Sequence, residues 1–150
     1  MRLRIIVFED DEPIRILLQA AIARLGHEVL AFSDPLACPL YTQDACTCTQ
    51  EHPCGDLLIT DNQMPRMTGL EFIRRQAERG CKGVAANKAV LSGNWSEVQR
   101  REAAELGCRI VRKPFDLGEL SDWIKEREAV IASGRQVVPA PVLTSLPGMP

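Results

Sequence analysis

Four predicted strands in this sequence each lead into a charged or hydroxyl side chain. Short apolar runs between turn signals are typical of strands that are buried on both faces of a sheet. Because parallel strands end along one edge of their sheet, side chains that follow them can converge from distant parts of the sequence. These side chains are Glu9, Asp10 and Asp11 after residues 5–8, Asp61 after 57–60, Ser92 after 88–91, and Lys113 shortly after 108–111.

Residues of these types are together suited to holding a phosphoryl group. Clustered carboxylates repel one another and need a cation, and oxygen ligands with room for water describe a Mg²⁺ site. A lysine supplies positive charge to phosphate oxygens, a serine hydroxyl can hydrogen-bond one of them, and an aspartate can act as the nucleophile. Taken singly, the acidic run could be an exposed loop, Ser92 a helix cap and Lys113 a solvated charge. The combination favours phosphoryl chemistry centred on Asp61.

The segments between the strands carry the apolar spacing of helices. Pro13 suits the first turn of a helix, and apolar residues at helical spacing continue to Leu25, before Gly26. A strand at 29–32 then completes a strand–helix–strand unit, from which parallel sheets are built. The sequence therefore predicts an α/β fold with a doubly wound sheet of five parallel strands. Further helices are predicted at about 69–79, 95–106 and 117–131, with a short one at about 36–41.

Composition places the chain among ordinary globular proteins. Its 150 residues are 45% hydrophobic and 25% charged, which fits a single domain. The formal charge of −2 does not favour binding to nucleic acid or membranes. No apolar run approaches the ~20 residues of a membrane span, and too few apolar residues follow Arg2 and Arg4 for a signal peptide. We therefore expect a cytoplasmic protein.

The ordered set of motifs resembles the receiver domain of two-component response regulators over roughly residues 2–131. RIIVFED fits the first strand, DNQMPRMTG begins at the phosphoacceptor position, and LSG and RKPF fit the ends of the fourth and fifth strands. The resemblance implies a CheY-like, flavodoxin-like sheet with strand order 2-1-3-4-5. We expect a receiver domain at 1–131 and, at 132–150, a proline-containing tail without periodicity that is disordered.

The resemblance also implies roles for single residues. Asp61 would accept the phosphoryl group from a histidine kinase or a phosphotransfer protein. Lys113 would contact the phosphate and precede a cis bond to Pro114, and Ser92 would be the hydroxyl that responds to phosphorylation. Because the domain catalyses this transfer on itself, we expect a signalling protein rather than a conventional enzyme.

Mg²⁺ would be bound directly by Asp10 and Asp61, mainly through water by Glu9, and by the backbone carbonyl of Gln63. The register of the acidic run is open, because an alternative alignment pairs Asp10 with Asp11 instead of Glu9. We prefer Glu9, since that alignment keeps the whole first helix in step with the family pattern.

Two features differ from the usual pattern of the receiver family: the residue expected to respond to phosphorylation together with Ser92, and the output domain. Relatives usually carry an aromatic residue three positions before the lysine, where this sequence has Ile110. Coupling could then run through packing alone or through Trp95. No DNA-binding or enzymatic output domain follows in the sequence, so we expect a stand-alone receiver. It would signal to a downstream protein that the sequence does not identify, without direct binding to DNA or membranes.

Cysteines are the one unusual feature of the composition, with six in the chain. Four of them lie in a loop at about 37–55, which is longer than we expect for a receiver. Their thiolates could bind Zn²⁺ or an iron–sulfur cluster, although C-x-C is tighter than the usual C-x2-C. A disulfide or redox switch and plain thiols are the alternatives. The four are Cys38, Cys46, Cys48 and Cys54, whereas Cys81 and Cys108 are expected to lie apart from them.

Three other functions compete with the receiver interpretation. A haloacid-dehalogenase-type phosphatase needs a second aspartate where this sequence has Gln63. A flavodoxin-like electron carrier needs a Ser- and Thr-rich phosphate loop after the first strand, which is missing. The more serious alternative is a phosphorylation-independent scaffold, or a metal- or redox-sensing module, that uses the cysteine cluster on a receiver fold.

Overall fold

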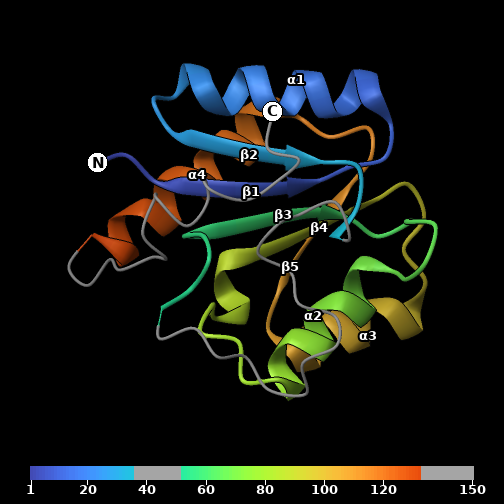
Figure 1. Ribbon diagram of the computed structural model, residues 1–150. Helices are drawn as coiled ribbons and strands as arrows, with labels where there is room; N and C mark the ends of the chain where they lie inside the picture. The colour runs from blue at the N-terminus through green and yellow to red at the C-terminus, as the bar shows by residue number, and fades with distance from the viewer. Residues whose placement is uncertain (36–51, 133–150) are drawn as a thin grey trace.

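The computed structural model describes residues 1–35 and 52–132, and it is built around one parallel sheet (Figure 1). The five strands lie in the order β2-β1-β3-β4-β5, which confirms the predicted fold class and strand order. The central strands β1, β3 and β4 are mostly apolar and are buried along their whole length. The strands are β1 (Arg4–Phe8), β2 (Glu28–Phe32), β3 (Leu57–Asp61), β4 (Lys88–Ser92) and β5 (Arg109–Arg112).

Helices cover both faces of the sheet. Figure 1 shows α1 and α4 on one face and α2 and α3 on the other. Each face has its own apolar core: Leu18 and Trp123 pack into the first, and Phe72 packs edge-on against Phe8 in the second, with ring centroids 5.4 Å apart. The helices are α1 (Glu12–Arg24), α2 (Gly69–Glu78), α3 (Glu97–Leu106) and α4 (Leu117–Ile131), with a short 3-10 helix, η2 (Ala85–Asn87), before β4.

Polar side chains fix where the helices begin. Thr68 accepts a hydrogen bond from the Glu71 N–H at the start of α2, and Ser96 and Gln99 form a capping box at the start of α3. At its other end, α3 stops at Gly107, whose positive φ of 86° favours glycine. The predicted helix at 95–106 therefore begins two residues later than expected, after its Ser96 cap.

Some of the sequence predictions lie outside the described residues. They are the short helix at 36–41, three of the four clustered cysteines (Cys38, Cys46 and Cys48) and the tail beyond residue 132. Within 1–35 and 52–132, none of the helices has the length and apolar character needed to cross a membrane.

Candidate functional site

The predicted site residues meet at the carboxyl edge of the sheet, where Phe8, Asp61 and Ser92 end their strands. The parallel register places Asp61 beside Leu91 of β4, and Ser92 beside Arg112 of β5. Lys113 follows directly and donates its backbone N–H to the Ser92 carbonyl at 2.9 Å. Residues from four parts of the chain are thereby held at one edge, as the strand endings predicted.

Lys113 joins the two buried carboxylates of the site. Its Nζ lies 2.8 Å from Glu9 Oε1 and 3.1 Å from Asp61 Oδ1. The lysine side chain keeps 20% of its surface exposed, whereas the Glu9 side chain is completely buried. The ammonium therefore neutralises the acids while it stays within reach of a group that approaches from solvent. The bond from Lys113 to Pro114 is cis, as predicted.

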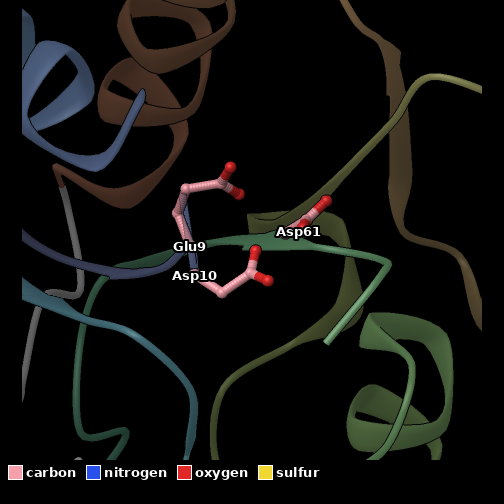
Figure 2. Close-up of side chains that lie close together, drawn as sticks. All are labelled: Glu9, Asp10 and Asp61. Atoms are coloured by element: carbon pink, nitrogen blue, oxygen red, sulfur yellow. The ribbon is translucent and has the colours of Figure 1, made fainter. Parts of the chain in front are cut away.

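Three carboxylates gather beside this lysine. Glu9, Asp10 and Asp61 each offer an oxygen atom within 4.8 Å of the others, and Figure 2 shows them around one space at the strand ends. Glu9 Oε2 is buried and has no hydrogen-bond partner among the described residues. An orphaned carboxylate oxygen inside an all-oxygen donor set is suited to a hard divalent cation. These residues therefore fit Mg²⁺.

Burial and neighbouring charges shift the pKa values of the site in opposite directions. Burial raises the pKa of Glu9 to about 7, and the charges of Asp61 and Asp10 add to the effect, while the hydrogen bond from Lys113 opposes it. Burial also raises the pKa of Asp61, again against the influence of Lys113. For Lys113, burial alone would lower the pKa, but its hydrogen bonds to Glu9 and Asp61 outweigh burial and raise it. The lysine is thus held as a cation.

Asp11, the alternative member of the acidic pair, has a different role. Its side chain accepts a hydrogen bond from the Ile14 N–H at 3.4 Å and caps α1. It is absent from the carboxylate group, which contains Glu9 instead. The geometry therefore agrees with the preferred register. Arg15 was not anticipated: it donates from Nη1 to the Glu9 carbonyl at 2.8 Å and so fixes the backbone at the site.

The loop after Asp61 is closed tightly onto the strand end. Asn62 Oδ1 accepts the Leu70 N–H at 3.2 Å, and Gln63 and Thr68 pair across the loop. A Cβ at Gly69 would lie only 2.7 Å from the Asp61 carbonyl oxygen, so this position requires glycine. The DNQMPRMTG motif contains these residues, but their contacts depend on the folded loop. The role of the Gln63 carbonyl as a Mg²⁺ ligand stays a prediction.

Ser92 is buried at the same edge, but its hydroxyl faces the following loop. Its Oγ accepts a hydrogen bond from the Asn94 N–H at 3.2 Å. Next in the chain, Trp95 donates from Nε1 to the Val111 carbonyl of β5 at 3.0 Å. Trp95 and Ile110 both pack against the core that lies under α2 and α3. An aromatic ring from this loop is thus anchored to the strand that leads to Lys113.

The cysteine cluster is represented by one member only. Cys54 is half-buried, and its three predicted partners lie outside the described residues. Within the described chain, the metal-competent group is the acidic one at the carboxyl edge. Zinc or iron–sulfur binding therefore gains no support from the described structure.

Fold and site together define a class: a doubly wound α/β domain with an aspartate, an acidic cation site and a lysine at the carboxyl edge of its sheet. Residues 5–125 match the family model described as response regulator receiver domain. The chain belongs to this family of two-component signalling domains, whose members carry a phosphorylatable aspartate.

The chain is similar to proteins of very different lengths. It is 35% identical over 119 residues to the DNA-binding transcriptional regulator NtrC of Azospirillum brasilense, covering 77% of this chain but only 22% of that protein. It is 29% identical over 127 residues to the response regulator receiver protein CpdR of Brucella abortus, covering 82% of this chain and 94% of that protein.

A solved structure shares the fold. The receiver domain of a sensor histidine kinase from Pseudomonas aeruginosa PAO1, described with a magnesium ion coordinated in its active site cleft, superposes with a TM-score of 0.63. The identity is 21%, and the match covers 89% of this chain and 100% of that domain.

Proposed function

We propose that Asp61 accepts a phosphoryl group from a histidine kinase or a phosphotransfer protein and holds it as an acyl phosphate. One observation carries the proposal: the Asp61 carboxylate lies 3.1 Å from Lys113 Nζ and within 4.8 Å of the Glu9 and Asp10 oxygens. Membership of the receiver family supports it. The second function considered from the sequence, a cysteine-based metal sensor, has no comparable observation behind it.

The residues of the site would have different roles in phosphoryl transfer. A carboxylate oxygen of Asp61 attacks phosphorus, and the bond to the donor nitrogen breaks as the new P–O bond forms. Lys113 supplies a fixed positive charge to the phosphoryl oxygens. Glu9, Asp10 and Asp61 would hold Mg²⁺, which neutralises charge on the transferred group when it is bound. The magnesium described for the Pseudomonas receiver supports this assignment.

The same geometry suggests how phosphorylation is read. A phosphate on Asp61 attracts the Ser92 hydroxyl, which at present hydrogen-bonds Asn94. Moving Ser92 pulls the loop that carries Trp95, and Trp95 is tied to β5 through Val111. The surface formed by α3, β5 and α4 would then change its fit to a downstream protein.

Phosphorylation of the purified chain tests the proposal. With acetyl phosphate as donor, the wild type should gain one phosphoryl group in the presence of Mg²⁺ and none after chelation, as seen on phosphate-affinity gels. Asp61→Asn should take no label, because the amide is not a nucleophile for this step. Asp122→Asn, an exposed acid on α4, is the matched control and should label normally. Labelling of Asp61→Asn at the wild-type level would refute the assignment.

A further inference from the structure

A second group of reactive side chains lies at the amino edge of the sheet, where Arg4, Leu57 and Lys88 begin their strands. A cavity opens there between β1, β3, β4 and α2, floored by apolar residues such as Phe8 and Phe72. Lys88, Cys81 and Cys54 line the same cavity. Cys81, which we expected to lie apart from the clustered cysteines, therefore lines the same cavity as Cys54.

Lys88 is the central residue of this group. It is 5% exposed, and its Nζ donates to Gln76 Oε1 at 2.8 Å and to Cys81 Sγ at 3.7 Å. None of the ion pairs in the described part of the chain involves Lys88. Burial lowers the pKa of this lysine, which increases the share of neutral amine with a free electron pair.

Cys81 presents its sulfur to that amine. The Gly83 N–H also donates to Cys81 Sγ, at 3.4 Å, so two donors converge on the sulfur. The thiolate is the form of cysteine that peroxide oxidises. Cys81 is only half-buried, so a small oxidant can reach it from the cavity. The pair combines an oxidisable sulfur with a nucleophilic nitrogen in contact with it.

We infer that Cys81 and Lys88 form an oxidant-responsive pair that closes a covalent sulfur–nitrogen bridge on reaction with hydrogen peroxide. In the first step, Cys81 Sγ attacks one peroxide oxygen, the O–O bond breaks, and the sulfur becomes a sulfenic acid as water leaves. In the second step, Lys88 Nζ attacks this sulfur, the S–O bond breaks, and the hydroxyl leaves as water with a proton from nitrogen. The sulfur is oxidised by two electrons, and the peroxide is reduced to water.

A thiol reductant reverses the bridge. Attack of an external thiolate on Cys81 Sγ breaks the S–N bond and returns the proton to Lys88, and a second thiol then restores the free cysteine as a disulfide forms between the reductant molecules. The modification is therefore a switch rather than terminal damage.

The bridge is independent of the proposed phosphoryl site. Lys88 begins β4 and Ser92 ends it, so the two chemistries are separated by about 13 Å of extended chain. Closing the bridge ties the segment after α2 to the first residue of β4. Asp61 takes no part in the reaction, so the inference stands or falls separately from phosphorylation.

Peptide mapping of the full chain after peroxide treatment tests the inference. In the reduced protein, trypsin separates residues 80–82, which contain Cys81, from 83–88, which end at Lys88. A bridged Lys88 resists trypsin, so residues 80–82 should be found joined to 83–100, with the loss of two hydrogen atoms. Dithiothreitol should abolish this species.

Variants separate the bridge from its competitors. Cys81→Ser and Lys88→Met should lose the joined peptide, whereas Cys54→Ser, Cys108→Ser and Lys82→Arg should keep it. The matched control is Lys82→Arg, which removes the lysine next to Cys81 but preserves the trypsin site.

Three results would overturn the inference, and the wild-type map alone can give each of them. The first is a disulfide that joins Cys81 to Cys54, and the second is a link from Cys81 to Lys82. The third is oxidation of Cys81 to sulfinic or sulfonic acid, with the peptide that ends at Lys88 still released normally.

Discussion

Lys113 and Lys88 lie at opposite edges of the same sheet, and their surroundings shift the pKa values of these two lysines in opposite directions. Lys113 contacts Glu9 and Asp61, which raise its pKa despite burial. Lys88 contacts the neutral amide of Gln76 and the sulfur of Cys81, and burial lowers its pKa. The carboxyl edge thus has a permanent cation, and the amino edge has an amine that can give up its proton.

The side chains that contact a buried lysine, more than its exposed fraction, decide what chemistry it can perform. Lys88 is more buried than Lys113, with 5% of the residue exposed against 20% of the Lys113 side chain. A cation beside two carboxylates suits electrostatic stabilisation of a phosphoryl group. An amine without a carboxylate partner among the described residues suits covalent chemistry, as buried lysines with lowered pKa values do in other proteins.

The largest expected effect comes from removing the cation at the carboxyl edge. Lys113→Ala should slow phosphorylation of Asp61 by about 10²–10³-fold, the usual effect of losing one group that stabilises charge in the transition state. Rates with acetyl phosphate and Mg²⁺ measure this, and Lys125→Ala, an exposed lysine on α4, is the control. Lys113→Arg should recover part of the rate, which distinguishes lost charge from lost folding. A wild-type rate in Lys113→Ala would contradict the comparison.

A smaller effect is expected from a second buried base near the amino edge. His27 lies just before β2 and its Nδ1 accepts the Leu3 N–H at 3.1 Å; burial lowers its pKa. The unfolded chain then binds a proton that the folded chain excludes, so stability falls as the pH drops from 6.5 through the folded-state pKa. His27→Asn keeps an acceptor near Nδ1 and cannot titrate in this range, so it should remove this part of the pH dependence.

Urea unfolding at several pH values between 5 and 8 measures this dependence. His52→Asn leaves His27 in place and is the control that carries the same substitution at the other histidine. An unchanged pH dependence in His27→Asn would show that burial does not govern this base.

The smallest effect is expected at Lys88. Lys88→Met removes a buried amine that has no ion-pair partner among the described residues, so the free energy of unfolding should change by less than about 1 kcal/mol. Phosphorylation of Asp61 should continue at the wild-type rate. Denaturant unfolding and the acetyl phosphate assay check both statements. A loss of several kcal/mol would show that Lys88 is a structural cation after all, and would remove the contrast with Lys113.

The sequence predicts the sheet and most of the carboxyl edge because both follow from one-dimensional patterns. Continuous apolar runs define the buried strands, and the residue after each run must lie at the same edge. The register of the acidic run is harder to predict, since Asp10 and Asp11 are adjacent acids and only the folded helix start shows that Asp11 is a cap.

Sequence patterns of this kind do not predict contacts that depend on how side chains pack in the folded protein. The approach of Cys81 to Lys88 depends on how the segment after α2 turns back to β4, and the hydrogen bond from Arg15 depends on the first turn of α1. Ser92 was correctly placed at the strand end, but its orientation toward Asn94 is a property of the folded loop.

The close contact between Gly69 and the Asp61 carbonyl has a consequence for engineering receivers of this kind. Because the backbone at Gly69 passes directly against the strand end, residues 62–68 leave and re-enter the fold at nearly the same point. The interior of such a loop can be varied, with Asn62 and Thr68 kept because they hold its two ends to α2. Substitutions confined to the exposed positions Gln63, Pro65 and Arg66 would leave the contacts that close the loop in place.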